Sequence, residues 1–418
     1  MKSHFHFKVI LNLCLFWGLF FQFSCQKVKV EQLIPDSCQI LVRINFPELI
    51  SAKGGQQHLV DMIQTKWNFD LQNSGLDFYQ PAYFFKTQFE NANGYFLMAG
   101  IDSETSFRKT LLKLNPTGKI EEFSDFHIFD LSGAKVVWQK QNCILYFFNP
   151  ISGPEIKGED LSQFLVKENL SRGQDPFPKK EMVSFKAEIQ EESSIPLLPP
   201  VEANIVGNAQ LIEGKWMLDA VLKEKQILPF FLPFDMPIAK SGANKSCMIR
   251  LAVKPDWAKV GEALSGFFNF SFLNEAIDKM EKAEGPMWAM VEGCTVENIQ
   301  KSASLAARFS SKQEADSVFE LNSRIMKAIT IPESLEMKTK DNWVYYISKG
   351  KTNHEFPEWN KSSNRALLWL EASQPESLIK LMVFPGSTKE EVKVSAEITN
   401  PEKIDFEEAE NLFEKLPI

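Results

Sequence analysis

Histidine is scarce in this sequence, and its spacing excludes the common zinc motifs. The chain has 5 histidines in 418 residues. No two of them form an HExxH pattern, and no two cysteines form a CxxC pair. Zinc sites in proteins usually need ligands at such spacings. We therefore predict no metal site and no cofactor. The histidines are His4, His6, His58, His127 and His354.

Catalytic motifs are missing as well. The sequence contains neither a GxSxG nucleophile elbow nor a GxxxxGK[ST] phosphate loop. Neighbouring acids such as Glu159–Asp160 and Glu407–Glu408 diverge along a helix or strand, so they do not form the facing carboxylate pair of a glycosidase. We predict no catalytic residues, and a protein that is not an enzyme.

Basic charge is also low. Lys and Arg number 46 against 54 Asp and Glu, which gives a net charge of −8. Loss of Lys2 and Lys8 with an N-terminal signal changes this charge from −8 to −10. An acidic chain without basic blocks lacks the electrostatic footprint of a nucleic-acid-binding protein. It also lacks a polybasic patch for anionic lipids.

What the sequence does have is an export signal. Lys2 and Lys8 precede an apolar run of about 13 residues, which is too short to span a membrane. Cys25 follows directly after Ser24, an arrangement that resembles a bacterial lipoprotein signal. We expect residues 1–24 to be removed, Cys25 to be lipidated, and 25–33 to form a tether. The segment Phe21–Phe23 departs from a strict lipobox, so a cleaved signal without lipidation is the alternative.

This signal predicts the location of the protein. We expect a chain that is exported and held by its lipid on a bacterial membrane, at the outer membrane and facing the periplasm. Lys27 and Lys29 follow Cys25 without an acidic run, and this favours the periplasmic face of the membrane. The membrane, contacted through lipidated Cys25, is therefore the first expected partner.

Hydrophobic periodicity predicts mixed α and β structure. Ile40, Val42 and Ile44 alternate with Leu41 and Arg43, which indicates a half-buried strand. Farther along, Ser103 is expected to cap a helix. The inward side chains expected for that helix are Phe107, Leu111 and Leu114.

The same order of elements recurs in the second half of the chain. Residues 37–44 align with 246–253, and 183–189 resemble 392–398. We expect an α+β protein with two similar lobes from an internal duplication, each a largely antiparallel sheet packed with helices. The expected bounds are 34–226 for the first lobe, 227–239 for a packed Pro-rich linker, 240–400 for the second lobe and 401–418 for a C-terminal helix.

Four cysteines remain after Cys14 is removed and Cys25 is lipidated: Cys38, Cys143, Cys247 and Cys294. An exported chain permits disulfides. The wide spacing and the large lobes favour buried, unbridged thiols instead. If bridges do form, we expect them within a lobe, between the first two or between the last two.

Two stretches carry a family resemblance: IPDSCQILVRI from Ile34 and SGLDFYQPAYFF from Ser74. Together with the repeated layout, they resemble a family of Bacteroidota-type envelope lipoproteins whose domain has no assigned function. The resemblance covers most of the mature chain. It implies an envelope location and no activity, substrate or site.

Function is therefore predicted mainly from the expected location of the chain in the cell envelope. We expect a non-enzymatic binding or scaffolding role, with an envelope protein or glycan as a possible partner. Trp359, in a polar stretch, is the candidate binding residue, although a tryptophan packed against its own lobe is the alternative. The 35 phenylalanines leave open a carrier of a hydrophobic ligand. A hydrolase of an unrecognised type is the third hypothesis.

Overall fold

The structure is a computed structural model of the chain, and its elements form two compact units. Unit 1 comprises Met1–Ser37, Asn73–Tyr83 and Thr87–Pro176, and unit 2 comprises Cys38–Gln72, Phe84–Lys86 and Phe177–Ile418. The structure describes residues 29–35, 37–52, 73–89, 92–131, 133–147, 156–166, 177–191, 201–224, 230–236, 248–265, 271–292, 304–328, 335–348, 365–373 and 377–400. The expected signal, Cys25, Trp359, Cys247, Cys294 and the expected C-terminal helix lie outside these residues.

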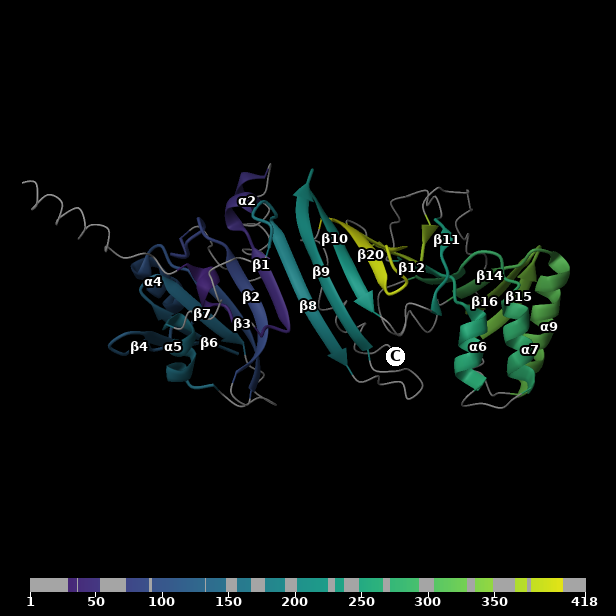
Figure 1. Ribbon diagram of the computed structural model, residues 1–418, viewed down its shortest axis with the longest axis horizontal. Coiled ribbons are helices and arrows are strands. Elements are labelled where there is room, and N and C mark those ends of the chain that lie inside the picture. Colours follow the sequence, from purple (N-terminus) through teal and green to yellow (C-terminus); the bar gives the residue numbers. More distant parts are fainter. Residues whose placement is uncertain are drawn as a thin grey trace, which may run out of the picture. The chain divides into compact units, whose positions relative to one another are not determined.

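The molecule is α+β and built around a large antiparallel sheet, as the sequence predicts. In unit 1 the strands pair in the order β2–β3–β7–β6–β5–β4 (Figure 1). Their bounds are β2 (Ala82–Phe89, which is shared with unit 2), β3 (Ala92–Gly100), β4 (Glu121–Glu122), β5 (His127–Leu131), β6 (Ala134–Gln139) and β7 (Asn142–Phe147).

Two helices cover opposite faces of the unit 1 sheet. On one face, Phe107 of α4 (Glu104–Leu114) meets Trp138 at a ring distance of 5.7 Å. On the other face, Phe164 of α5 (Gly158–Val166) lies 5.3 Å from Phe96. Trp138 lies in register with an odd-numbered residue of β7, and Phe96 lies in register with an even-numbered one. Because successive residues of a strand point to opposite faces of the sheet, Trp138 and Phe96 lie on opposite faces.

Helix α4 confirms most of its sequence prediction. The Ser103 hydroxyl accepts the Ser106 N–H at 3.3 Å, so Ser103 is the N-cap. Phe107 and Leu111 are buried. Leu114 is not, since it is 42% exposed. It shares their helix face, but it belongs to the last turn, where the helix ends.

The packed chain of unit 1 begins earlier than predicted. Val30–Leu33 forms a short 3-10 helix, η1, which contacts α5 and β3. Val30, Leu33 and Ile34 are all buried. Residues 30–33 of the expected tether 25–33 therefore belong to the packed unit, because the apolar side chains of η1 enter the core.

Unit 2 continues the antiparallel pattern in the order β1–β8–β9–β10–β20–β19–β18–β12–β13–β14–β16–β15. The strand bounds are β1 (Ile40–Ile44), β8 (Val183–Glu191), β9 (Val201–Ile212), β10 (Lys215–Glu224), β12 (Met248–Val253), β13 (Met287–Glu292), β14 (Ser304–Arg308), β15 (Leu335–Lys340), β16 (Trp343–Ser348), β18 (Leu368–Ser373), β19 (Leu378–Pro385) and β20 (Glu391–Thr399).

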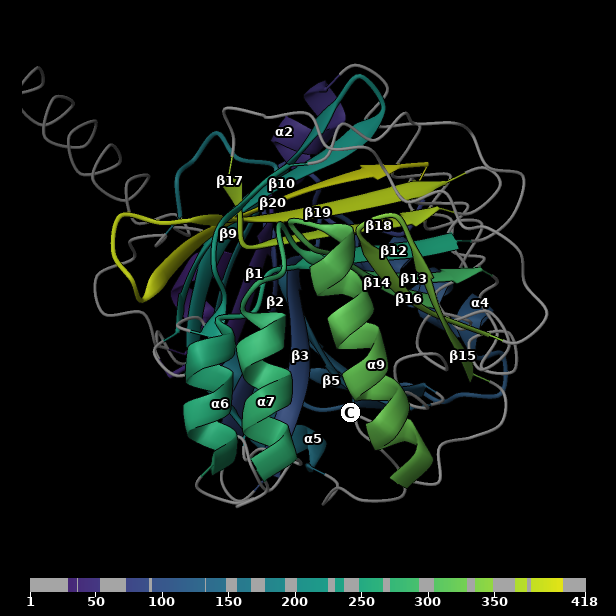
Figure 2. The same cartoon turned by 90° about the vertical axis from the view of Figure 1, so that its right-hand side faces the viewer.

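Helices cover part of this sheet. Helix α7 contacts α6 and α9, and α9 packs on β15 and β16 (Figure 2). The helices are α2 (Phe46–Ser51), α6 (Trp257–Ser265), α7 (Ser271–Met280) and α9 (Lys312–Ala328). Across the described ranges, no helix combines the length and the apolar character needed to cross a membrane.

The described part of the Pro-rich linker packs, as predicted from its apolar content. Within residues 230–236, Phe234 and Asp235 form β11, which pairs with β17 (Arg365–Ala366). Phe234 is buried beside Trp288 and Trp369, whose rings meet edge to face at 5.7 Å. This segment therefore contributes to the core of unit 2.

Strand order repeats on the two sides of the β10–β20 pair. The order β10–β9–β8–β1 on one side is matched by β20–β19–β18–β12 on the other. In this order, Ile40 faces Ala187 and Ile249 faces Ala372. The sequence match of 183–189 with 392–398 does not agree with this strand order. Residues 183–189 lie in β8, which corresponds to β18, whereas 392–398 lie in β20, which corresponds to β10. The duplication and its lobe bounds stay predictions.

Candidate interaction site

A tight turn in unit 1 presents one tyrosine to solvent. Tyr79 is 89% exposed, although both Asp77 before it and Tyr83 after it are buried. The Asp77 carboxylate accepts the Tyr79 N–H at 2.9 Å and the Gln80 side-chain amide at 2.6 Å. The Asp77 N–H in turn donates to the Gly100 carbonyl at 2.9 Å. A buried, hydrogen-bonded aspartate thus fixes the backbone that carries the exposed ring.

Gly75 attaches this turn to the N-terminus of α4. Its φ of +80° favours glycine, and a Cβ there would lie only 2.4 Å from the Phe107 N and the Ser103 O. The Gly75 carbonyl accepts the N–H groups of Asp102 and Ser103. The residues just before α4 are therefore bonded to the turn, and the two segments form one rigid piece. We call residues 73–81 the Tyr79 turn.

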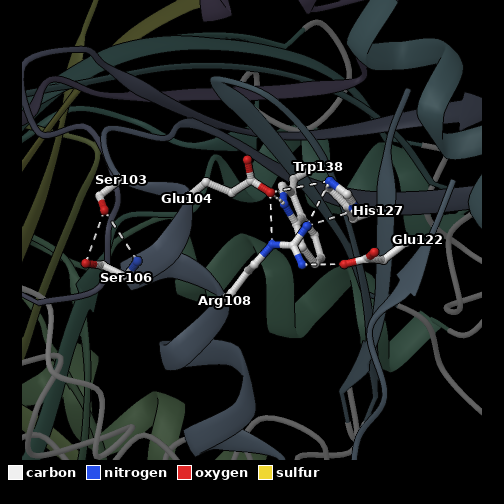
Figure 3. A network of polar contacts seen from close by, with 7 residues as sticks. All are labelled: Ser103, Glu104, Ser106, Arg108, Glu122, His127 and Trp138. Atoms are coloured by element: carbon white, nitrogen blue, oxygen red, sulfur yellow. Dashed lines mark hydrogen bonds and ion pairs between the residues drawn. The ribbon is translucent and has the colours of Figure 1, made fainter. Parts of the chain in front are cut away.

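Glu104 and Arg108 of the same helix belong to a cluster of charged and aromatic side chains (Figure 3). The Arg108 Nε lies 2.9 Å from Glu104 Oε1, and its Nη1 lies 2.6 Å from Glu122 Oε1. Its guanidinium stands over the ring of Trp138, 5.7 Å from the centroid. The His127 Nε2 lies 3.3 Å from Glu104 Oε1. We call these five residues the Arg108 cluster.

The electrostatics of the Arg108 cluster favour its charged forms. Burial acts to raise the pKa of Glu104, but hydrogen bonds from Arg108 and Trp138 outweigh it and lower the pKa below its ordinary value. The hydrogen bond from Arg108 also lowers the pKa of Glu122. The hydrogen bond to Glu122 raises the pKa of Arg108. Both carboxylates are therefore ionised at neutral pH, so neither has a proton to donate as a general acid.

In the Arg108 cluster the acidic side chains are paired with the arginine. Within the described ranges, His127 forms no hydrogen bond with a serine, threonine or cysteine, and no group of three His, Cys, Asp or Glu side chains is arranged to hold a metal ion. Each carboxylate is held by the guanidinium, which also stacks on Trp138. The arrangement ties α4 to β5 and β6 and so supports the Tyr79 turn.

The predicted site residues have separate outcomes. Cys25 and Trp359 lie outside the described residues, as do His58 and His354. His127 is described, and its neighbours are Glu104, Arg108 and Trp138.

The described cysteines are Cys38 and Cys143, which are buried and not joined in a disulfide, as expected. Burial raises the pKa of the Cys143 thiol to about 12. This thiol is therefore protonated and unreactive at neutral pH.

An apolar cavity in unit 2 bears on the carrier hypothesis. It is lined by Met280, Phe309 and Tyr346 among others, and its volume is about 10 Å³. This is about the space that one water molecule needs. Sites for drug-sized ligands occupy roughly 300–1,000 Å³. The cavity is therefore a packing defect in the core between sheet and helices.

Sequence reasoning missed Tyr79. The signal was available, because Gly75, Asp77 and Pro81 are turn-forming residues around an aromatic pair. The same stretch carries the family resemblance, and its pattern predicts a strand after Pro81 without indicating an exposed ring before it. Hydrophobic periodicity did not indicate that Phe78 and Tyr79 differ in exposure, since a turn has no regular period.

Comparison with known proteins gives little to add. No protein-family model matches the chain, and no curated protein matches it. Among solved structures, it is similar to crystal form IV of TP0453, with 10% identity and a TM-score of 0.33 over 47% of this chain and 81% of that one. Crystal form I of TP0453 gives 10% identity and a TM-score of 0.33 over 49% and 83%. Scores this low do not establish a shared fold.

Proposed function

We propose that the chain is a lipid-anchored protein of a bacterial envelope that works by binding a partner, without catalysis, and that the Tyr79 turn is its contact site. The observation that carries this proposal is the exposure of Tyr79 on a backbone fixed by Asp77 and Gly75. A rigid aromatic side chain gives up little conformational entropy on binding, and tyrosine is enriched where proteins meet partners.

The partner is an envelope protein or a glycan. A tyrosine ring offers an apolar face for stacking and a hydroxyl for hydrogen bonding, and both classes of partner use these groups. The Arg108 cluster is a support in this proposal. Its charges are already paired, so it holds α4 and the turn in place.

Photocrosslinking tests the contact. A photoreactive phenylalanine replaces Tyr79 in cells that produce the lipidated chain, and a matched variant carries it at the exposed Leu112 of α4. We expect a discrete adduct from position 79 and none from position 112. Digestion of the adduct with protease or with glycan hydrolase identifies its class. Equal adducts at both positions, or none at either, would contradict the proposal.

Fractionation tests the anchor. Cys25→Ser should move the mature protein from the membrane fraction to the soluble envelope fraction, because the lipid supplies the membrane affinity. Metabolic labelling with a fatty acid should mark the wild type and leave the variant unlabelled. A wild-type chain that takes up no fatty acid is not a lipoprotein.

The other two hypotheses lack a supporting observation of this kind in the described residues. A carrier needs a cavity much larger than the 10 Å³ found beside Tyr346. A hydrolase needs a nucleophile with its base in reach, and His127 instead faces Glu104 and Arg108.

A further inference from the structure

The start of the packed chain lies very close in sequence to the expected lipid. Val30 follows Cys25 by five positions and is only 1% exposed. Leu33 and Ile34 are buried with it, and η1 contacts α5 and β3 of unit 1. Val30 is thus already part of the packed body of unit 1.

This short connection limits how far unit 1 can stand from a membrane. A fully extended chain spans at most about 3.6 Å per residue, so Val30 lies within about 18 Å of Cys25. Lipid headgroups occupy about 5–8 Å on each side of a bilayer. About 10–13 Å of tether is then left above the headgroups even when it is fully stretched. A helix with its side chains is about 10–12 Å across, so a taut tether leaves room for one helix layer at most.

We propose that the tether holds unit 1 against the membrane that carries the Cys25 lipid, with the surface around η1 facing the lipid headgroups. This inference rests on the proposed lipidation of Cys25. It adds which unit lies next to the bilayer and which of its surfaces faces the lipid.

Charge does not supply this docking by itself. The exposed Lys29, at 68%, is 3.7 Å from Glu31 of η1. The start of α5, which η1 contacts, adds Lys157 together with Glu159 and Asp160, so acids outnumber bases there. The attraction of the two basic residues to anionic headgroups is therefore cancelled by the neighbouring acids. The tether length holds the surface at the bilayer, and salt should have little effect.

A quenching experiment tests the proposal. The lipidated full chain is placed in vesicles of phosphatidylethanolamine and phosphatidylglycerol that contain a headgroup-spin-labelled lipid. One variant carries a fluorophore at Glu31→Cys in η1. The control carries it at Lys113→Cys on α4, across the unit 1 sheet from α5. Both variants also carry Cys247→Ser and Cys294→Ser, and the thiols of Cys38 and Cys143 are buried and so protected from labelling. We expect at least twofold stronger quenching at 31 than at 113, at both low and high salt.

A lengthened tether separates the cause. Insertion of about 20 Gly and Ser residues between Gln26 and Lys27 adds a reach of about 25 Å. The difference between positions 31 and 113 should then disappear while fatty-acid labelling persists. Equal quenching in the lipidated wild type would overturn the proposal, and so would a difference that survives the insertion. Absence of the fatty-acid label in the same samples would instead show that the lipid anchor itself is wrong.

Discussion

Arg43 and Arg108 carry the same guanidinium group, but unit 2 buries one of them while unit 1 leaves the other partly open. Arg43 of β1 is 2% exposed, whereas the Arg108 side chain is 29% exposed. Each stacks on an aromatic ring, Arg43 on Phe177 at 5.6 Å and Arg108 on Trp138 at 5.7 Å. Their hydrogen-bond acceptors differ in kind.

Arg43 is held by neutral backbone oxygens. Its side chain donates to the carbonyls of Phe177 and Pro178, just before β8. Asn45, next on the same face, donates its side-chain amide to the Lys179 carbonyl at 2.8 Å. These contacts fix the path of a segment that enters the sheet. Arg108 instead meets the carboxylates of Glu104 and Glu122, which solvent also reaches.

The comparison teaches that burial and acceptor type decide what an arginine does. When a buried donor set is removed, carbonyls are left without partners, and each costs about 1–3 kcal/mol. A surface ion pair loses little, because water replaces the partner and about 0–1 kcal/mol is typical. The predictions below test this difference, in order of decreasing effect on stability.

Removing the buried arginine should have the largest effect. We expect Arg43→Leu to lower the free energy of unfolding by about 2 kcal/mol, since the buried Phe177 carbonyl loses its donor, whereas water can replace the donor at the exposed Pro178. Urea unfolding of the purified mature chain measures this change. Arg43→Lys keeps the charge with fewer donors, so it should lose less. A Leu variant whose free energy of unfolding is within about 0.5 kcal/mol of wild type would contradict a stabilising role for the Arg43 hydrogen bonds.

Removing the exposed arginine should cost less. Arg108→Ala should lower the free energy of unfolding by about 1 kcal/mol, from the lost contact with Trp138 and the weak surface pairs. The same urea series measures it, with Arg108→Lys as the control that keeps the charge. If Arg108→Ala costs as much as Arg43→Leu, the contrast between the two sites is wrong.

The Arg108 cluster should also make stability depend on pH. The folded pKa of Glu104 is lowered below its ordinary 4.5, so the ionised form stabilises the fold. This contribution is fully present above the unfolded pKa and is lost as pH falls through the folded pKa. Glu104→Gln should therefore be less stable than wild type at about pH 7, and the difference should be smaller at about pH 3. An equal difference at both pH values would contradict the ion pairs.

Sequence patterns predicted local structure well where one rule dominated. The period of two predicted the strand at Ile40–Ile44, and the cap rule predicted the start of α4 at Ser103. Neither pattern indicated that Leu41 and Arg43 are the buried side of β1. The reason is that the Nη1 and Nη2 groups of Arg43 donate to carbonyls more than a hundred residues away, and no local rule contains those contacts.

The candidate site was harder to predict, for a similar reason. Trp359 was chosen because it stands in polar sequence. Tyr79 stands among Phe78, Tyr83 and Phe84, a composition typical of a core. What exposes Tyr79 is the turn held by Asp77 and the close approach of Gly75 to Ser103. Such contacts form only when distant segments pack, so composition near a residue is a poor guide to its exposure.

Unlike the two arginines, Tyr79 should contribute almost nothing to the stability of the fold, yet it should contribute most to binding. We expect Tyr79→Ala to change the free energy of unfolding by less than about 0.5 kcal/mol, because its ring is 89% exposed. Asp77→Ala should cost about 1–3 kcal/mol, since it removes the buried acceptor of the turn. Competition by each purified variant against formation of the position-79 adduct measures binding. Both variants should compete poorly, whereas Leu112→Ala competes like wild type. If Tyr79→Ala competes fully, the exposed ring is not the contact.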